Sequence, residues 1–349
     1  MGVGTRRGRR GPRGGTCGRH RLRWLLVEVL RFVLMLVAVS FVTFALVAAS
    51  PVDPVSANVG QAALMSMSAE RRAALAAYWG KDRPLLERYG SWALDVLHGD
   101  FGTSLRFNAP VASVVGERLS LSLGLLLLAW LVSGAMGFLL GTMAGARPGC
   151  AVDRIVRGYC YLMGATPVFW VGMVVLFVFA VRLHAAPVGL AVPIGSTLSS
   201  VSLADRLSHM VLPGLTLALT GVAPVALHTR ERVIEVMGSD YVRFARARGE
   251  SGVRVVLRHV PRNVAAPALM LQGASMGELV GGSVLVEQVF SYPGLGQAAV
   301  TAGLGGDAPL LVGIALATAV LVYFGNAVAD LLRRRIDPRG GEDVHGMHR

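Results

Sequence analysis

An acidic side chain lies in the middle of one of the chain's apolar runs. Glu278 follows the uncharged stretch Asn263–Gly277 and precedes another that reaches Val286. A charge near the centre of a bilayer costs on the order of 2.5 kcal/mol or more, so such groups usually face water or a polar partner. Two interpretations stay open. Glu278 is a protonated or hydrogen-bonded carboxyl that seals a helix contact, or it lines a pore and favours a cationic solute.

We identify no catalytic or metal-binding pattern elsewhere in the sequence. Lys81 is the single lysine and Asp82 follows it, so the GxxxxGK[ST] phosphate-binding loop occurs nowhere and the chain cannot itself be an ATPase. HExxH and CxxC spacings do not occur either. Four histidines lie at no metal-ligand spacing and are more typical of interfacial or hydrogen-bonded residues: His184, His209, His228 and His259. We therefore expect no catalytic residue, metal or cofactor bound by this chain.

The segment Asp240–Gly249, with the sequence DYVRFARARG, is an arginine-rich stretch between two apolar runs. From Arg230 to Arg262 the chain carries eight arginines and four acidic residues. Positively charged loops between membrane spans stay on the cytoplasmic side. We therefore expect the segment to face the cytosol and to offer a docking surface there. A solvated basic loop that only enforces topology is the alternative.

Local patterns predict a short helix within this segment. Ser239 is suited to its N-cap, Asp240 to its first turn, and Gly249 to the left-handed residue that ends it. Helical spacing then places four residues along one face: Tyr241, Phe244, Ala245 and Arg248.

This helix has the residue types of a docking element. Phe244 offers an aromatic anchor, and the small Ala245 and Ala247 would let a partner's surface approach closely. The surrounding arginines, including Arg246 and Arg248, favour an acidic or carbonyl-rich groove on that partner.

Composition independently indicates a membrane protein. Hydrophobic residues make up 53% of the 349 residues and charged residues 16%, which excludes an ordinary soluble domain. Six charge-poor runs each reach the roughly 17 to 25 residues that a helix needs to cross about 30 Å of hydrocarbon. They are Phe32–Ser50, Leu119–Ala146, Gly158–Val181, His209–Thr229, Asn263–Val286 and Ala308–Ala329. We therefore predict an all-α polytopic membrane protein with six transmembrane helices.

The distribution of arginine predicts how these spans are oriented. The segment before the first span carries nine arginines against one acid, Glu28. Residues 51–118 carry seven basic and seven acidic residues and so belong outside. The loop 145–157, the loop 230–262 and the C-terminal tail are basic. With six spans, both termini are expected in the cytoplasm.

The same pattern divides the chain into segments. They are a basic cytoplasmic arm (1–31), the first span (32–50), an extracytoplasmic insert (51–118), a core with spans two to six and the loop 230–262 (119–335), and a cytoplasmic tail (336–349). The basic arm directly precedes a span, which favours contact with anionic lipid and needs no nucleic acid to explain the net charge of +13.

The extracytoplasmic insert is too small and polar to be an independent enzyme. Residues 69–78 and 85–97 have helical patterns, with Pro84 at a helix start. Apolar residues such as Tyr89 and Trp92 could cover the mouth of a pore. The insert is therefore either a lid or a surface for a substrate-delivering protein.

Prolines and glycines mark spans that bend or pack closely. Prolines within or at the ends of helices bend them, which is tolerable where neighbouring helices or water satisfy the freed carbonyls. These are Pro167 in the third run, Pro213 and Pro224 in the fourth, and Pro267 in the fifth. Gly281 and Gly282 are expected to loosen the fifth run near its outer end. The small-xxx-small series Gly137, Gly141 and Gly145 predicts close helix packing.

The arginine-rich segment and its surroundings resemble the cytoplasmic EAA loop of ATP-binding cassette importer permeases, in the dipeptide, oligopeptide and nickel branch. There an Asp-Tyr pair and an Ala-x-Ala-x-Gly run precede a basic stretch, an Arg-Asn pair and a proline that opens the next span. The matching residues are Asp240, Tyr241, Ala245, Ala247, Gly249, Arg258, Arg262, Asn263 and Pro267.

The resemblance covers nearly the whole chain. Further matches in the family's order and spacing are PVDPV at Pro51, HGDFGTSL from His98, TPVFWVG from Thr166, LVEQVFSYPGLG from Leu285 and DPR at Asp337. Two departures stand out. Phe244 replaces the glutamate for which the family's loop is named, and Glu278 lies where the branch more usually has an apolar or small residue.

The resemblance implies a MetI-like permease fold and an inner-membrane subunit that forms half of a translocation pore. The implied partners are a second homologous permease, expected to give a heterodimer, two ATP-binding subunits that use ATP, an extracytoplasmic solute-binding protein and membrane lipid, without nucleic acid. The implied solutes are peptides or nickel and metal-chelate compounds. The expected pore-lining residues are Glu278, Gly281, Gly282 and Pro167.

The implied mechanism is alternating access, in which closure of the ATPase pair moves the helices of residues 239–260 and so rotates the pore helices. A secondary transporter or a channel not coupled to ATP is the first alternative, but it would need charge relays in several spans, whereas only Glu278 qualifies. An intramembrane hydrolase is the second, and it would need a paired nucleophile and base.

Overall fold

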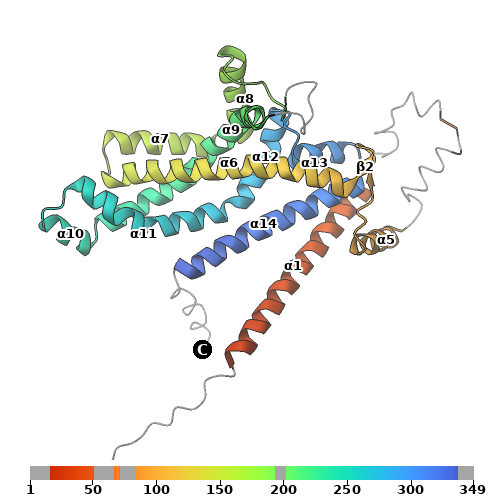
Figure 1. Ribbon diagram of the computed structural model, residues 1–349, viewed down its shortest axis with the longest axis horizontal. Helices are drawn as coiled ribbons and strands as arrows, with labels where there is room; N and C mark the ends of the chain where they lie inside the picture. Colours follow the sequence, from red (N-terminus) through yellow and green to blue (C-terminus); the bar gives the residue numbers. More distant parts are fainter. Residues whose placement is uncertain (1–15, 51–66, 69, 71–83, 193–201, 337–349) are drawn as a thin grey trace, which may run out of the picture.

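The computed structural model describes residues 16–50, 67–68, 70, 84–192 and 202–336. Within these ranges the chain is almost entirely helical (Figure 1). The described part of the chain contains one sheet, an antiparallel pair of two-residue strands, β1 (Thr103–Ser104) and β2 (Ala109–Pro110). The all-α prediction is confirmed.

Four described helices are long and apolar enough to cross a membrane without a break. They are α1 (Thr16–Ala48), α6 (Val111–Ala146), α9 (Leu203–Met237) and α14 (Ala308–Ile336). Three shorter helices lie outside these spans: α5 (Leu85–Leu97), α10 (Asp240–Ala247) and α13 (Leu295–Leu304).

Two further spans are bent pairs of helices. The first joins α7 (Ala151–Ala165) at 109° to α8 (Val168–Val175), which continues as the π-helix η1 (Leu176–Arg182). The second joins α11 (Gly252–Ala274) to α12 (Met276–Val289) at 50°. Counting each pair as one span gives the six that the sequence predicts. The third and fifth runs are nevertheless broken helices and not straight ones.

The bend between α7 and α8 has a local cause. Proline disfavours the helical conformation of the residue before it, and Thr166 accordingly adopts an extended conformation with φ −100° and ψ 127°. Its hydroxyl donates to the Leu162 carbonyl over 2.7 Å, which satisfies a carbonyl in the last turn of α7. Pro167 then forms the N-cap of α8. In Figure 1, α8 projects away from the rest of the bundle.

Helices α6 and α9 lie side by side along most of their lengths (Figure 1). The predicted glycine stripe makes this approach possible. A Cβ atom at Gly137 would lie 2.7 Å from the Val225 side chain, and one at Gly141 would lie 2.5 Å from the Ala226 carbonyl oxygen. The prediction of close helix packing through these glycines is confirmed, and α6 with α9 forms the frame of the bundle.

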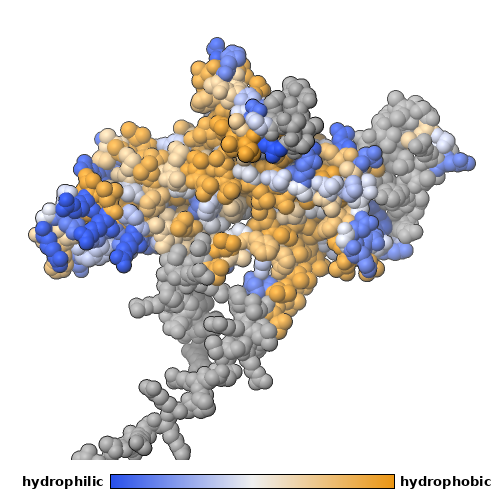
Figure 2. Space-filling view, in the orientation of Figure 1, coloured by the Kyte–Doolittle hydropathy of each residue, from blue (hydrophilic) through white to orange (hydrophobic). Residues whose placement is uncertain are grey.

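The two ends of the bundle differ in polarity from its middle. Figure 2 shows apolar residues over much of the visible face, with hydrophilic residues gathered at the end that carries α10 and at the end that carries the β1–β2 hairpin. The loop between α6 and α7 lies at the same end as α10 (Figure 1). The two loops that the sequence predicts to be cytoplasmic therefore share one end.

The described part of the insert packs on the first helix. The predicted helix at 85–97 is confirmed as α5, with Pro84 at its N-cap. The Tyr89 hydroxyl lies 2.8 Å from Ser40 Oγ of α1, and Tyr89 also stacks edge-on with Phe44. Of the residues 69–78, for which a helix is predicted, all but residue 70 lie outside the described ranges.

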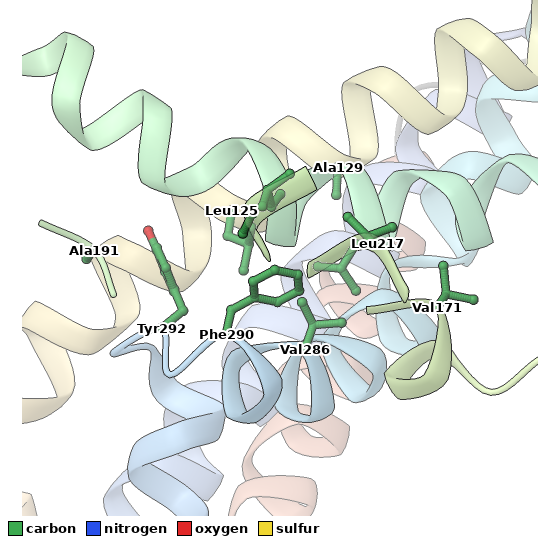
Figure 3. Packing of buried hydrophobic residues seen from close by; sticks show 11 residues of the cluster. Leu125, Ala129, Val171, Ala191, Leu217, Val286, Phe290 and Tyr292 are labelled. Carbon is green, nitrogen blue, oxygen red and sulfur yellow. The ribbon is translucent and has the colours of Figure 1, made fainter. Parts of the chain in front are cut away.

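A buried apolar cluster joins four of the spans. Leu125 and Ala129 of α6, Val171 and Val175 of α8, Leu217 of α9, and Val286 of α12 all belong to it. Phe290 and Tyr292 follow α12 and complete the cluster (Figure 3). It fixes the bent helix α8 against α12, and these two helices border the main cavity.

Candidate functional site

A cavity with a volume of about 770 Å³ lies between α7, α8, α9 and α12. Its walls are mostly apolar, with a few hydroxyl groups and one carboxylate. Of the predicted pore-lining residues, Glu278, Gly281 and Gly282 all line it. Pro167 is not part of the lining, although Thr166 and Val168 on either side of it are. No residue of α5 is part of its lining.

Glu278 belongs to the first turn of α12 and its side chain is exposed to the cavity. The hydroxyls of Thr220 in α9 and Ser275 line the same space. This placement differs from a carboxyl sealed between helices. It puts the single acidic group of the cavity among apolar walls, where a positive charge would have no other acidic partner.

The break in the fifth run lies earlier than predicted. We expected Gly281 and Gly282 to loosen the helix, but α12 continues through both to Val289. The bend occurs at Ser275, six residues before the glycine pair. Glycine weakens a helix only modestly and does not by itself break it. Gln272, three residues before the break, contacts Trp130 of α6. No local sequence pattern indicates this contact.

One hydrolase spacing escaped the sequence analysis. Gly273–Gly277, GASMG, matches G-x-S-x-G, in which the serine of a hydrolase lies on a strand-to-helix turn. Here Ser275 joins two helices, and its hydroxyl donates to the Gln272 carbonyl over 2.9 Å. The context that the motif requires is missing, so the spacing indicates no nucleophile.

The predicted docking helix is present as α10. Ser239 is its N-cap residue, but its hydroxyl donates back to the Val236 carbonyl and does not cap the helix. Asp240 in the first turn pairs with Arg243 over 2.5 Å. Gly249 has φ +86°, the left-handed conformation predicted from its position. The ends of the helix are therefore as predicted, apart from the cap.

The residues of the predicted docking face differ in how far they are exposed. Tyr241 and Phe244 are 44% and 68% exposed. Ala245 is only 8% exposed, because it packs with Val242 against Val255 of α11. The prediction that Ala245 lets a partner approach is wrong. Ala245 lies three residues after Val242 on the same face of α10, and this face packs against α11.

The remaining predicted residues of this segment are exposed. Ala247, Arg246 and Arg248 lie on the open side of α10, and Arg262 and Asn263 on α11. Arg258 is near Glu250, with Nη1 3.4 Å from Oε1. Beside it, an open groove of about 420 Å³ is lined by Ser251, Val253, Arg254, Leu257 and Arg258. Exposed apolar and cationic groups thus share one surface at this end of the bundle.

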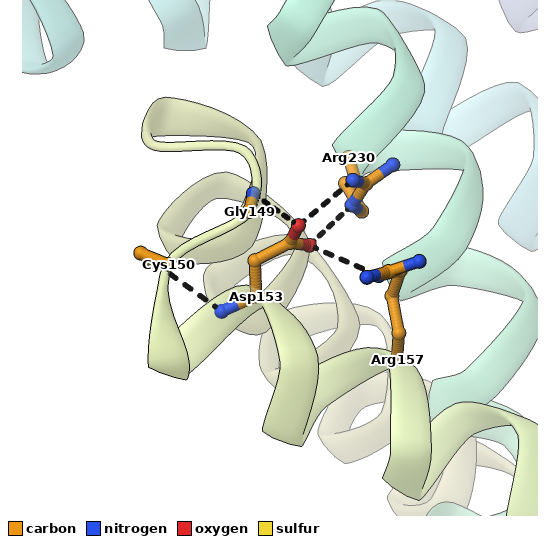
Figure 4. Close-up of polar contacts among 5 residues, drawn as sticks. All are labelled: Gly149, Cys150, Asp153, Arg157 and Arg230. Carbon is orange, nitrogen blue, oxygen red and sulfur yellow. Dashed lines mark hydrogen bonds and ion pairs between the residues drawn. The ribbon is translucent and has the colours of Figure 1, made fainter.

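A buried ion pair connects this end of the bundle to α7. Asp153 has no exposed surface, and Arg230 of α9 holds both carboxylate oxygens, at 2.5 Å from Nε and 2.9 Å from Nη2 (Figure 4). The Gly149 amide donates to the same carboxylate over 2.8 Å. In the sequence these residues stand out only as charges of the two basic loops. Asp153 and Arg230 lie 77 positions apart in the sequence, so local patterns could not show that they pair.

A second buried acid, Glu287, lies near the C-terminal end of α12. Glu287 is fully buried, and its carboxylate accepts from Ser122 Oγ over 2.7 Å and from the Gln297 amide over 3.0 Å. Ser122 Oγ in turn accepts from the Leu295 amide over 2.8 Å. Glu287 therefore fixes the first turn of α13 to α6. In the sequence Glu287 stands out only as part of the longer family match LVEQVFSYPGLG.

Comparisons with known proteins agree with this architecture. Residues 137–340 match the family described as "Binding-protein-dependent transport system inner membrane component". The oligopeptide transport system permease protein AppB of Bacillus subtilis is 29% identical over 90% of this chain and 98% of its own length. The dipeptide transport system permease protein DppB of Escherichia coli is 31% identical over 87% of this chain and 94% of its own length.

The family match covers more than half of the chain and includes both bent spans, the cavity residues and the arginine-rich segment. The relatives extend the likeness beyond the residues that the family model matches, because they align over 87% to 90% of the chain. The chain therefore belongs to the inner membrane components of binding-protein-dependent transport systems, the permease subunits of ATP-binding cassette importers.

Proposed function

We propose that this chain forms half of the translocation pore of an importer for peptides. The observation that carries the proposal is the cavity between α7, α8, α9 and α12, which holds a single carboxylate at Glu278. Its volume of about 770 Å³ falls within the roughly 300 to 1,000 Å³ of small-molecule sites. The relatives' names refer to dipeptides and oligopeptides, which supports peptides over nickel-type solutes.

The family implies ATP-binding subunits and a solute-binding protein as partners. We infer that the second pore subunit is a homologous permease, giving a heterodimer, and that this chain is a pore subunit without enzymatic activity or bound cofactor. ATP would then be used by the partner subunits. The wide apolar exposure of α8 and η1, with Trp170 and Phe177 each about half exposed, supports cover by lipid or by another membrane subunit.

The α10 segment is the proposed contact with the ATP-binding subunits. Phe244 projects with 68% exposure from a helix that Val242 and Ala245 anchor to α11. Val253 and Leu257 lie exposed beside the nearby groove. An exposed aromatic residue among arginines is a typical centre of a protein–protein interface. Movement of the bound subunits would thus be transmitted through α10 to α11.

Orientation follows from the same assignment. The loop 145–157 and the α10 segment share one end of the bundle, and we propose that this end and both termini face the cytosol. The β1–β2 hairpin would then lie outside, where a solute-binding protein docks.

We predict that replacing Phe244 by Asp detaches the ATP-binding subunits. The loss of a central aromatic residue costs about 2 kcal/mol or more at an interface, or roughly 30-fold in affinity. Co-purification of the ATP-binding subunits with the membrane-inserted variant should therefore fall at least about tenfold, and uptake should stop. Leu97→Asp, which alters an exposed residue of α5, is the control and should retain them. Normal co-purification with Phe244→Asp would show that α10 is not the contact.

We predict that Glu278→Gln selectively weakens uptake of cationic peptides. The amide keeps size and hydrogen bonding but removes the negative charge, and loss of about 1.4 kcal/mol corresponds to a tenfold change. Uptake of a peptide with a free amino terminus should fall about tenfold, whereas uptake of its N-acetylated form should change little. Glu117→Gln, an exposed acid of α6 outside the cavity, is the matched control. Equal uptake by Glu278→Gln and wild type across a range of pH would reject a pore-lining role.

We predict that a membrane-impermeant maleimide applied from outside labels a single cysteine at Thr103 and spares one at Ala151 or Gly340. The background would lack the three native cysteines, and permeabilised cells would serve as the control for reactivity. Thr103 and Ala151 are both exposed. The β1–β2 hairpin, which contains Thr103, and the start of α7 at Ala151 lie at opposite ends of the bundle (Figure 1). Labelling of Gly340→Cys in intact cells would mean an odd number of spans.

A further inference from the structure

The joint between α11 and α12 lies between the two proposed functional regions. Helix α11 begins at Gly252, directly after the α10 segment, and α10 packs on it through Val242 and Val255. Helix α12 begins at Met276 and supplies the cavity wall from Glu278 to Leu285. The chain bends by 50° between them at Ser275. Any movement that passes from α10 to the cavity along this part of the chain must pass through this joint.

The last turn of α11 is fastened to α6 by its backbone. The final four carbonyls of a helix lack their usual partners, and the Gln272 carbonyl is one of these. It accepts from Trp130 Nε1 of α6 over 2.9 Å and from Ser275 Oγ over 2.9 Å. Such replacement donors make a broken helix tolerable inside a bilayer.

The same two residues are joined a second time in the reverse direction. Gln272 Nε2 donates to the Trp130 carbonyl over 2.7 Å and lies 3.0 Å from Ser133 Oγ. Each residue thus gives a side-chain donor to the backbone of the other. Gln272 is only 3% exposed. The pair holds the end of α11 at one point on α6, which is itself locked to α9 by the glycine stripe.

The surroundings of this point leave room for α11 to move. A cavity of about 250 Å³ lies between α6, α9 and α11, and its lining includes Gly134, Phe138, Ala268 and Gln272. Gln272 Oε1 is buried without a hydrogen-bond partner among the described residues. The lining includes the exposed residue Leu269, so the pocket opens to the surface and α11 has open space beside its contact with α6.

We propose that Trp130 and Gln272 form the pivot about which α12 turns when α10 and α11 move. The proposal rests on the proposed function, in which α10 receives motion from ATP-binding subunits and α12 lines the solute path. Trp130 and Gln272 are positioning residues, because neither lines the main cavity nor belongs to the α10 segment. Their bonds keep the joint in place on α6, so that a displacement at α10 becomes a rotation of the wall that carries Glu278.

The test uses the whole transporter, with its second permease, ATP-binding subunits and binding protein, in proteoliposomes. Trp130→Phe removes the indole donor but keeps an aromatic ring, and Gln272→Met removes the amide at similar length. Both variants should retain the ATP-binding subunits and hydrolyse ATP, while peptide uptake per ATP hydrolysed falls about tenfold. Trp92→Phe makes the same change in α5, where the indole Nε1 has no hydrogen-bond partner among the described residues, and should leave this ratio unchanged. A wild-type ratio in both variants would overturn the pivot.

Two further measurements separate the pivot from a general packing defect. If the residues act as one unit, the double variant should be no worse than the more affected single variant, whereas independent defects would multiply. If Gln272→Met does not assemble, Trp130→Phe alone decides the outcome through the following labelling experiment.

In that experiment a cysteine at Gly281, on the cavity wall, is labelled from outside with and without ATP, in a background that lacks the three native cysteines. A nucleotide-dependent labelling rate in the otherwise wild-type transporter should disappear in Trp130→Phe. If the rate never depends on nucleotide, the proposed function fails. If it depends on nucleotide equally with and without Trp130→Phe, only the pivot fails.

Discussion

Within a bilayer every backbone polar group must be satisfied by the protein itself, and both broken spans of this permease depend on that constraint. At the first break the Thr166 hydroxyl bonds the Leu162 carbonyl, and at the second Trp130 and Ser275 bond the Gln272 carbonyl. Side chains therefore replace the helical donors that the bends remove. Because α8 turns away and α12 tilts, the cavity opens between them.

The cavity also requires parts that do not bend. Glycines of α6 let this helix approach α9 so closely that a Cβ atom at these positions would collide with α9. At the α10 end, Asp153 and Arg230 fix α7 to α9, and at the opposite end Glu287 fixes α13 to α6. Removing one partner of a buried charged pair typically costs about 3 to 5 kcal/mol. The frame of α6 and α9 is thus held at both ends, and Glu287 also joins the C-terminal end of α12 to α6.

The sequence predicts the features that depend on composition and short spacing. Six apolar runs, the limits of α10, the left-handed Gly249 and the glycine stripe all follow from local patterns. Features that depend on distant contacts do not. The break at Ser275 rather than at Gly281 accompanies a bond from Trp130, 142 positions from Gln272. Ala245 looks available on a helical wheel, yet Val255 of the next helix covers its face.

The central claim is that this chain conducts solute only when ATP is used by subunits bound to its cytoplasmic end. The most direct measurement is uptake of a labelled peptide by proteoliposomes that contain both permeases and the ATP-binding subunits, with the binding protein outside. The account predicts uptake that requires hydrolysable ATP on the cytoplasmic face and is unaffected by a proton ionophore. Uptake that continues without ATP and collapses with the ionophore would contradict it and would identify a secondary transporter.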